Sequence, residues 1–311
     1  MGTNLLNQNL LRSDITGIHI EPTNICTLKC PGCARTRVIK QWPQHWKNHS
    51  INIVDVVKFL DIDLKNKKII LCGNYGDPIY HPNLFDLINQ LKQRGCFVSI
   101  VTNGSYKTAE WWHKLVTVLD STDTVTFSVD GLPANFTNYR INADWTSIQQ
   151  AMQICVKSAA RTVWKFIPFA YNINDINSVK QLSESMGIDL FQLEKSDRFD
   201  EITAEFKPAA EFIQVRYQAQ QDWKLNKSQT VLTPRCADGR EHFISADGYY
   251  MPCCFIGDHR FYYKTQFGKN KRQYKISDTT LSQILDQSAT IEFYNNLTQQ
   301  PVCQYSCPKT L

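Results

Sequence analysis

The sequence lacks the features that mark several large classes of protein. No apolar run in its 311 residues approaches the length that a membrane-spanning helix needs. The first 14 residues are polar and have no apolar stretch of the kind found in a secretory signal. The net charge is only +5, from 34 basic and 29 acidic side chains, which argues against a dedicated nucleic-acid-binding protein. We therefore expect a cytoplasmic protein that acts on neither membranes nor nucleic acids.

The cysteines do not indicate disulfide bonds, because their number is odd, eleven, and no secretory signal is found. Three of them, Cys26, Cys30 and Cys33, form a C-x3-C-x2-C run on one short segment with a Pro-Gly turn. Thiolates at this spacing can bind a single soft metal centre. A zinc site would normally supply four ligands in two pairs, and no His or Cys follows Cys33 at short range. The run therefore predicts a [4Fe-4S] cluster with one iron left open to a reactant.

Short apolar runs alternate along the chain with amphipathic runs. The apolar runs are rich in Ile, Val, Phe and Thr, as is typical of buried parallel strands, and lie at 17–20, 68–72, 97–102, 124–129, 162–168 and 190–193. Helices are predicted at 53–59, 82–94, 108–119, 145–159 and 175–186, with Pro82 as a first helical residue and Gly95 and Gly187 as C-terminal caps. Six such units predict an α/β fold, a partial (β/α)6 barrel of the TIM type over residues 1–207.

Polar and glycine-rich segments follow four of these predicted strands. They are the cysteine run, residues 73–78, residues 102–104 and residues 128–131. Each segment alone is an ordinary turn sequence. In a parallel barrel, however, the carboxyl ends of the strands meet at one rim, where the chemistry gathers. The four segments therefore predict one ligand site at that rim, with glycines that allow the backbone to approach a ligand.

The cysteine run and the rim segments together resemble the radical S-adenosylmethionine (SAM) superfamily, over roughly residues 18–194. The resemblance implies that the amino and carboxylate groups of SAM chelate the open iron. It also implies that an electron, delivered by a partner such as flavodoxin or ferredoxin, cleaves SAM to a 5′-deoxyadenosyl radical that abstracts hydrogen from a substrate. In such enzymes the cofactor supplies the reactive chemistry, and the protein binds and orients it.

The resemblance assigns SAM contacts to the first three rim segments. Gly32 stands before the third cysteine, where related proteins often have an aromatic residue beside the adenine, so a backbone contact is implied. Residues 75–78 resemble the family's Gly-Gly-Glu-Pro stretch, with Tyr for the first Gly and Asp for Glu. Gly76 and Asp77 are thereby predicted to bind SAM, Asp77 through the amino group, and Asn103 is predicted to join them. A plain turn role is the alternative for Asp77.

Four further SAM contacts are implied after the fourth and fifth strands. Ser128 and Asp130 resemble the Ser-x-Asp-Gly that lies near the ribose. Arg140 resembles an arginine that pairs with the SAM carboxylate, and a guanidinium suits this role because it binds carboxylates through two nitrogens. Asn172 matches an asparagine that is common in the superfamily. The residues themselves leave two alternatives open, a surface charge for Arg140 and a helix cap for Asn172.

The C-terminal third, residues 208–311, departs from the alternating pattern. A helix is predicted at 208–222, and the Asp247-Gly248 pair between two apolar runs predicts a β-hairpin. We therefore expect a small second domain that contains this hairpin.

The same third of the chain contains a second group of cysteines. Cys236, Cys253, Cys303 and Cys307 would make a closed site, and four thiolates suit a structural zinc as well as a cluster. Their order resembles the SPASM/Twitch extension of radical SAM enzymes, which implies one auxiliary [4Fe-4S] cluster. Cys254 is an alternative ligand in this site.

Structural roles are predicted for several remaining residues. Cys72, Cys96 and Cys155 lie inside strands or helices and are expected to act as small hydrophobes. Lys165 is expected at the surface, because a barrel interior would leave its charge unpaired; contact with SAM or substrate is the alternative. Residues 111–113 are expected to pack, and the basic stretch 264–275 to be a solvated loop, with an acidic peptide or RNA contact as the alternative.

The resemblance favours a radical SAM enzyme that oxidises or crosslinks a peptide, protein or small-molecule substrate. The segment 128–133, Ser-Val-Asp-Gly-Leu-Pro, resembles the maturases that carry this extension, which favours a peptide or protein. Two alternatives stay open: a nucleoside- or RNA-modifying radical SAM enzyme, and a non-catalytic iron–sulfur electron carrier. The polar rim argues against the carrier, because electron transfer alone needs no such rim. The sequence identifies no catalytic acid or base.

Overall fold

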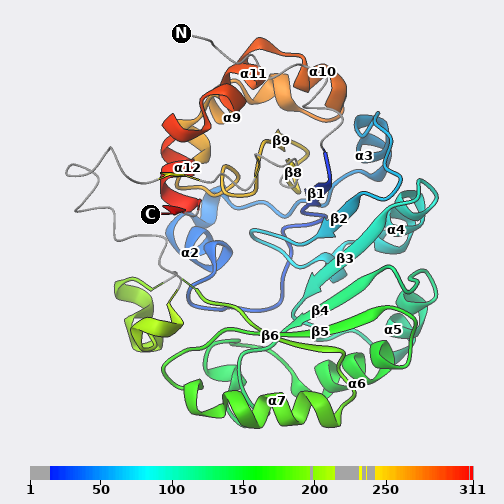
Figure 1. The fold of residues 1–311 in the computed structure, drawn as a ribbon, viewed down its shortest axis with the longest axis vertical. Helices are drawn as coiled ribbons and strands as arrows, with labels where there is room; N and C mark the ends of the chain where they lie inside the picture. Colours follow the sequence, from blue (N-terminus) through cyan, green and yellow to red (C-terminus); the bar gives the residue numbers. More distant parts are fainter. Residues whose placement is uncertain are drawn as a thin grey trace.

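The fold is described here from a computed structural model that covers residues 15–196, 199–213, 231–232, 236, 242–307 and 309–310. Its centre is one sheet of eight strands in the order β6-β5-β4-β3-β2-β1-β8-β9 (Figure 1). The strands are β1 (Gly17–Ile20), β2 (Lys68–Leu71), β3 (Phe97–Thr102), β4 (Thr124–Ser128), β5 (Arg161–Phe166), β6 (Leu190–Leu193), β8 (His242–Ile244) and β9 (Tyr250–Met251). The predicted parallel α/β sheet is confirmed, with ends that differ from the predicted ones by at most two residues.

Strands β1 to β6 pair in parallel, each with the next along the chain, and only β8 and β9 are antiparallel among the sheet's neighbours. Ile18, Ile69, Ile100 and Val125 are fully or almost fully buried, as is expected of strands with both faces covered. Because all six strands run the same way, their carboxyl ends and the loops that follow them lie along one edge of the sheet.

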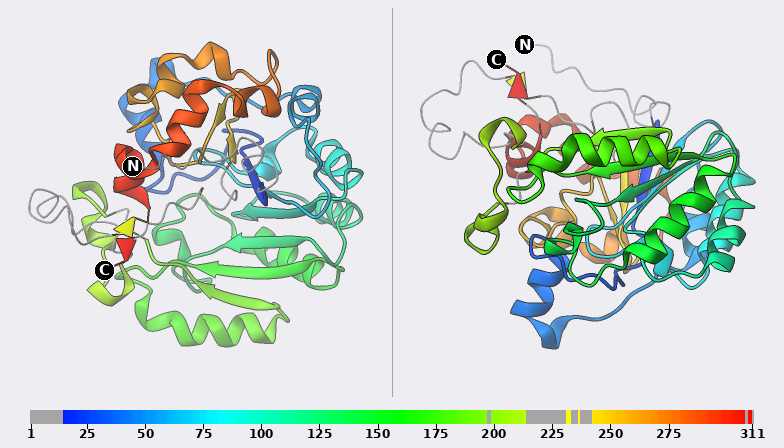
Figure 2. Two further views of the ribbon diagram at one scale, coloured as in Figure 1. Left: turned by 45° about the horizontal axis from the view of Figure 1, so that its top comes forward. Right: turned by 90° about the horizontal axis from the view of Figure 1, so that it is seen from below.

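Helices cover the outer side of this sheet (Figures 1 and 2). Asn52, Thr108 and Asp144 cap three of them by accepting backbone N–H bonds. Gly95 and Gly187 adopt positive φ after their helices, which confirms the two C-terminal caps. The helices are α3 (Ile53–Phe59), α4 (Leu84–Lys92), α5 (Ala109–Val116), α6 (Trp145–Val156) and α7 (Ile176–Ser185).

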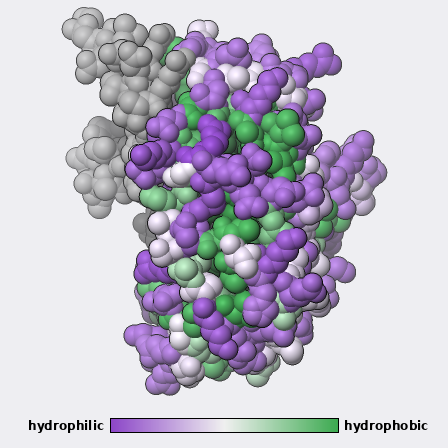
Figure 3. All heavy atoms as spheres, turned by 90° about the vertical axis from the view of Figure 1, so that its right-hand side faces the viewer, coloured by the Kyte–Doolittle hydropathy of each residue, from purple (hydrophilic) through white to green (hydrophobic). Residues whose placement is uncertain are grey.

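The face over these helices carries hydrophilic residues over most of its area (Figure 3). The inner faces of these helices are apolar, as is seen in α4, whose buried residues are Leu84, Leu87, Ile88 and Leu91. Of residues 111–113, which were predicted to pack, Trp112 is fully buried and Trp111 half-buried, but His113 is exposed. Pro82 was predicted as a first helical residue, but α4 begins two residues later. Among the described residues, no helix is long and apolar enough to cross a lipid bilayer.

The C-terminal part is built from short elements. They are β7 (Val231–Leu232), α9 (Gln266–Lys269), α10 (Leu281–Leu285), α11 (Ser288–Asn295), α12 (Pro301–Ser306) and β10 (Lys309–Thr310). The predicted hairpin is confirmed: β8 and β9 pair antiparallel, and Gly248 between them has positive φ. Figure 1 shows the helices of this part gathered above β1 and β8.

Two predictions for this part are wrong. The helix expected at 208–222 is absent from its described portion, where only a 3-10 turn, Ala210–Phe212, forms without a side-chain cap. Residues 214–222 lie outside the described residues. The stretch 264–275 is not a loop but a series of short helical turns, and Phe267 and Tyr274 anchor it in the core.

The hydrophobic core runs through both parts of the chain. Strand β8 pairs in parallel with β1, so the hairpin extends the sheet of the barrel. One continuous cluster of buried side chains reaches from Ile15 to Cys307. The predicted boundary between residues 207 and 208 therefore falls between segments that share a sheet and a core, and it stays a prediction.

Candidate active site

A cavity of about 290 Å³ opens at the carboxyl edge of the sheet. Its walls come from the segments that follow β1, β2, β3, β4, β5 and β6. Three of the predicted rim segments supply its polar groups, Asp77, Asn103 and Ser128, and the cysteine run supplies its sulfurs. The predicted meeting of these segments at one rim is therefore seen in the structure.

All three cysteines of the run line this cavity. Cys33 is the N-cap of the helix α2 (Ala34–Gln41), so its sulfur stands at a helix N-terminus, where negative charge is stabilised. Burial, as the largest cause, raises the pKa of the Cys26 and Cys30 thiols to about 12. The free thiols are thus protonated at neutral pH, and a metal centre would displace their protons on binding.

An aromatic and apolar shell packs against one side of the cysteine run. Cys30 packs with Leu28, Tyr139, Phe169 and Phe206, and the rings of Tyr139 and Phe169 stack with centroids 4.1 Å apart. Such a shell excludes water from a metal centre and lowers the local dielectric constant.

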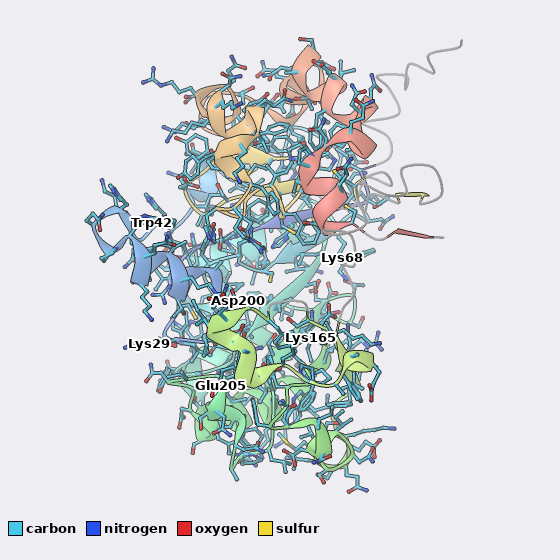
Figure 4. The ribbon with its side chains drawn as sticks, turned by 90° about the vertical axis from the view of Figure 1, so that its left-hand side faces the viewer. Lys29, Trp42, Lys68, Lys165, Asp200 and Glu205 are labelled. Atoms are coloured by element: carbon cyan, nitrogen blue, oxygen red, sulfur yellow. The ribbon has the colours of Figure 1, made fainter. Side chains whose placement is uncertain are left out.

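The segment that supplies Phe206 is anchored to α2. Arg37 of α2 binds Asp200 through two nitrogens, and Asp200 also caps the 3-10 helix η5 (Glu201–Phe206). Figure 4 shows Asp200 beside α2. The ion pair therefore holds the apolar shell against the helix that begins at the third cysteine.

The loop after β2 packs tightly against the cysteine run. A Cβ atom on Gly76 would lie 1.9 Å from the carbonyl oxygen of Thr23, so only glycine fits there. The N–H of Asp77 donates to the carbonyl of Ile25 at 2.9 Å. Gly76 thus brings its loop onto the segment that carries the cysteines, in agreement with its place on the cavity wall.

Asp77 joins two rim loops. Its Oδ2 accepts bonds from the N–H of Asn103 at 2.6 Å and from the Asn103 side chain at 2.5 Å. The same Asn103 amide lies 3.6 Å from the sulfur of Cys26. Burial raises the pKa of the Asp77 carboxyl to about 6, and the hydrogen bonds from Asn103 oppose that rise. The two residues therefore form one polar unit beside a cysteine sulfur.

Glu21 is a residue of this region that the sequence analysis did not find. It is 2% exposed and directly follows β1, and its Oε1 accepts the N–H groups of Tyr75 at 2.7 Å and Gly76 at 3.1 Å. Burial is the largest cause that raises its pKa to about 7. An acidic residue straight after a buried strand was the available signal, and its role is to hold the loop after β2.

Arg140 lines the cavity, and Asp130 lies behind it. The Arg140 Nε donates to Asp130 Oδ2 at 2.6 Å, and Asp130 is fully buried. The guanidinium also interacts with the thiol of Cys30. The open alternative of a solvated surface charge for Arg140 is therefore wrong. Asp130 is placed to orient this arginine rather than to line the cavity.

Three predicted SAM contacts do not line this cavity: Gly32, Asp130 and Asn172. Asn172 is fully buried, and its side chain bonds the N–H of Phe169 and the carbonyls of Asp130 and Ile167. It stands at the N-terminus of a 3-10 turn without capping it through its side chain. Asp130 and Asn172 therefore hold loops in place, and neither lines the cavity in which SAM was predicted to bind.

Two residues that were assigned structural roles lie on the cavity wall. Lys165 of β5 faces the cavity, not the outer surface, and its Nζ lies 3.4 Å from Glu194 Oε2 at the end of β6 (Figure 4). The neighbouring strand supplies the partner that makes this position tolerable for a charge. Cys72 also lines the cavity, whereas Cys96 and Cys155 are buried as predicted.

The second group of cysteines also comes together. All four are buried, and the pKa of Cys303 is raised first by its hydrogen bond to Cys307, then by burial and by the nearby Cys253 and Cys236. The pKa of Cys253 is raised by burial and by Cys236 and Cys307. The neighbouring Cys254 is partly buried, and its carbonyl accepts a bond from the Asn74 side chain at 2.7 Å; its role as an alternative ligand stays a prediction.

Comparison with known proteins decides the family. The model of the radical SAM superfamily matches residues 20–180, just over half of the chain. The chain belongs to the radical SAM superfamily. The model of an iron–sulfur cluster-binding domain, SPASM, matches residues 236–308 of this radical SAM chain. Membership of the superfamily supports an enzyme.

Several known proteins resemble this radical SAM chain. Native anSMEcpe with bound AdoMet and Cp18Cys peptide has a TM-score of 0.61 at 14% identity, covering 89% of this chain and 81% of that one. Streptococcus suis SuiB bound to precursor peptide SuiA has a TM-score of 0.61 at 12% identity, covering 96% and 73%. At these identities the likeness shows a shared fold.

A curated relative is the tungsten-containing aldehyde ferredoxin oxidoreductase cofactor-modifying protein of Pyrococcus furiosus. It is 31% identical over 121 residues, which are 37% of this radical SAM chain. The match spans about a third of that protein, 31% of its length.

The residues of both cysteine groups fit the groups that a radical SAM enzyme with a SPASM domain binds. The first domain implies a [4Fe-4S] cluster and SAM, and the second implies auxiliary cluster binding. The three thiols of one short run suit a cluster with an open iron, and four buried thiols suit a closed one. Within the described part of the chain, no group of three or more His, Cys, Asp or Glu side chains is arranged to hold a single metal ion.

Proposed function

We propose that this chain is a radical SAM enzyme of the oxidoreductase or maturase type, which cleaves SAM reductively and abstracts hydrogen from a peptide or protein. One observation carries the proposal: the three thiols of the C-x3-C-x2-C run face the same cavity as Asp77, Asn103, Ser128 and Arg140. When bound, the cluster and SAM supply the electron transfer and the 5′-deoxyadenosyl radical.

The cavity offers groups of both charges to an amino acid moiety. Arg140, oriented by Asp130, presents the guanidinium that suits the SAM carboxylate. Asp77, oriented by Asn103, presents the acceptor for the SAM amino group. Gly76 and Ser128 complete this wall. Gly32 does not line the cavity, so its backbone contact stays a prediction from the resemblance, while Asp130 and Asn172 act through the loops they hold.

The surroundings of the site suit radical chemistry. The shell of Leu28, Tyr139, Phe169 and Phe206 covers one side of the cysteine run. Exclusion of water by such a shell protects reactive intermediates from side reactions. The chain thus contributes binding, orientation and protection at this site.

A peptide or protein substrate is supported by two observations. The segment 128–133 resembles that of peptide maturases. The structures of similar fold include anSMEcpe with a peptide and SuiB with its precursor peptide. A small-molecule substrate is the second candidate, because the chain also matches 92% of the length of BtrN, solved with AdoMet and 2-DOIA, at a TM-score of 0.50.

Three further parts of the proposal concern the setting of the reaction. The electron donor is a reducing partner such as flavodoxin or ferredoxin, and the protein is cytoplasmic. The chain divides into a SAM-binding part, 1–207, and an auxiliary-cluster part, 208–311, with Cys236, Cys253, Cys303 and Cys307 as ligands. The family matches at 20–180 and 236–308 support this division.

The test is anaerobic reconstitution with iron and sulfide, followed by reduction in the presence of SAM. The expected product is 5′-deoxyadenosine, detected by liquid chromatography and mass spectrometry. Binding of iron at trace level only, or iron uptake without any SAM cleavage, would contradict the proposal and favour an electron carrier. Co-purifying RNA with steeply salt-dependent binding would favour the RNA-modifying alternative.

A further inference from the structure

A second, larger cavity of about 500 Å³ lies beside the first. Its lining includes Trp42 and Trp46, from the end of α2 and the segment after it. It also includes Asp247 and His259, from the C-terminal part. Tyr75 is the residue that the two linings share, so it lies at the border between the cavities. The second cavity has no role in the site described above.

Tyr75 is one of the two residues, with Asp77, at which this chain departs from the family's Gly-Gly-Glu-Pro stretch. Its hydroxyl accepts the N–H of His259 at 2.9 Å and donates to the carbonyl of Gly257 at 3.2 Å. The tyrosine therefore links the loop that carries Asp77 to the C-terminal part. A glycine at this position would lack both the ring and these two hydrogen bonds.

Aromatic rings form much of the wall of the second cavity. Trp46 lies against Tyr75 with ring centroids 6.0 Å apart, and Trp42 meets His259 edge-on at 6.4 Å. Trp42 and Tyr263 are 39% and 71% exposed, so their rings are not absorbed into the core. Aromatic faces that line a cavity attract cations through the ring quadrupole.

Two carboxyl groups share the cavity with these rings. Glu21 is buried, Asp247 is exposed, and the charge of Asp247 contributes to the raised pKa of Glu21. None of the ion pairs formed by the described residues includes either carboxyl. Lys47 is the one lysine or arginine on the described lining. Two acidic side chains thus share this lining with one lysine, and the exposed Asp247 carboxylate offers an opposite charge to a cation.

We propose that this cavity binds a basic side chain, lysine or arginine, of the peptide substrate. The inference rests on the proposed function in taking a peptide as the ligand. The aliphatic stem of the side chain lies along Trp42 and Trp46, and its charged end faces Asp247 and Glu21. With Tyr75 at the border, the bound residue lies in the second cavity and the cysteines line the first, so the residue that reacts is a neighbour of the basic one.

The experiment measures binding of N-acetyl-lysine methylamide to the reconstituted holoprotein by ligand-observed NMR. N-acetyl-norleucine methylamide, which has the same stem without the ammonium group, is the matched probe. The lysine probe is expected to bind about tenfold more tightly than the norleucine probe. Equal or tighter binding of the norleucine probe, or of N-acetyl-phenylalanine methylamide, would overturn the assignment of a cation site.

Variants locate the binding in this cavity. Asp247→Asn and Trp42→Ala are each expected to weaken binding of the lysine probe about threefold to tenfold, and Asp247→Asn to leave the norleucine probe unaffected. Glu110→Gln removes the same charge from an exposed position on α5, outside the cavity, and should change binding of neither probe. Wild-type affinity of the Asp247→Asn variant for the lysine probe would overturn the inference.

The binding readout needs no SAM cleavage, so the two proposals can fail separately. Lysine-selective binding without 5′-deoxyadenosine formation would remove the proposed function and leave the cation site. SAM cleavage without lysine selectivity would leave the proposed function and remove the cation site.

Discussion

The two cysteine groups differ in their surroundings more than in their chemistry. Cys26 and Cys33 are partly exposed on the wall of a polar cavity, whereas Cys236, Cys253, Cys303 and Cys307 are all buried in the main hydrophobic core. The first group is carried by a loop at the rim of the sheet, whereas the second comes from segments before and after the hairpin, Cys236 and Cys253, and from α12 and its C-terminal end, Cys303 and Cys307. A rim loop can leave an iron accessible, while a core site can only be closed. The difference predicts that the first group takes part in catalysis and that the second group stabilises the fold.

The largest expected effect comes from removing the rim cysteines. The triple variant Cys26→Ala, Cys30→Ala and Cys33→Ala should form no detectable 5′-deoxyadenosine and lose about four irons per chain, keeping the iron of the second group. The measurements are product analysis and iron content. SAM cleavage by the triple variant, or loss of all iron, would contradict the division of roles.

A smaller effect on SAM cleavage and a larger one on stability are expected at the core cysteines. Cys253→Ala removes a ligand from the core site and should destabilise the fold by about 3–5 kcal/mol, lowering Tm by roughly 5–10 °C. Its control is Cys155→Ala, a buried thiol of α6 outside both groups. That control should lower Tm by only about 2–4 °C and keep all iron. Equal Tm losses in the two variants would show that Cys253 is no ligand.

An intermediate effect is expected at Arg140. Arg140→Lys removes the guanidinium fork and should weaken SAM binding about tenfold, measured by anaerobic calorimetry. Asp130→Asn, which only loosens the arginine, should weaken it less. Arg161→Lys on the exposed start of β5 is the matched control and should bind SAM normally. Normal SAM affinity of Arg140→Lys would show that the Arg140 guanidinium does not bind the SAM carboxylate.

The smallest effect concerns Glu21, which directly follows β1 and lines the second cavity. Its pKa is about 7 in the folded chain against an ordinary value of 4.5, so the folded state holds the proton more tightly. The resulting stabilisation is complete below pH 4.5 and is lost as the pH rises through about 7. Thermal melts of the ligand-free protein should therefore show a Tm that falls more steeply from pH 5 to pH 8 than the Tm of Glu21→Gln. Parallel curves would contradict the raised pKa.

The sequence predicted the parts of the site that follow from strand direction. Cys26, Asp77, Asn103 and Ser128 each follow a different parallel strand, and parallel strands bring their carboxyl ends to one edge. No knowledge of side-chain contacts was needed for that result.

The sequence could not predict roles that depend on the partner of a side chain. Asp130 and Arg140 lie ten residues apart, and only the fold shows that the first holds the second. Lys165 was placed at the surface because its partner, Glu194, belongs to the next strand and is invisible in the local pattern. Glu21 was missed for the same reason, since its bonds run to a loop 54 and 55 residues away.

The parallel pairing of β8 with β1 has a mechanical consequence. The strand that leads into the rim cysteines is flanked by β2 on one side and by the hairpin of the C-terminal part on the other. Neighbouring strands are held about 4.8 Å apart by their hydrogen bonds. The strand that leads to the rim cysteines and the hairpin that leads to Cys253 are therefore parts of one continuous sheet, and the two cannot move apart without breaking its hydrogen bonds. Movement of one cysteine group relative to the other is left to the loops and the helix α12 that carry the cysteines.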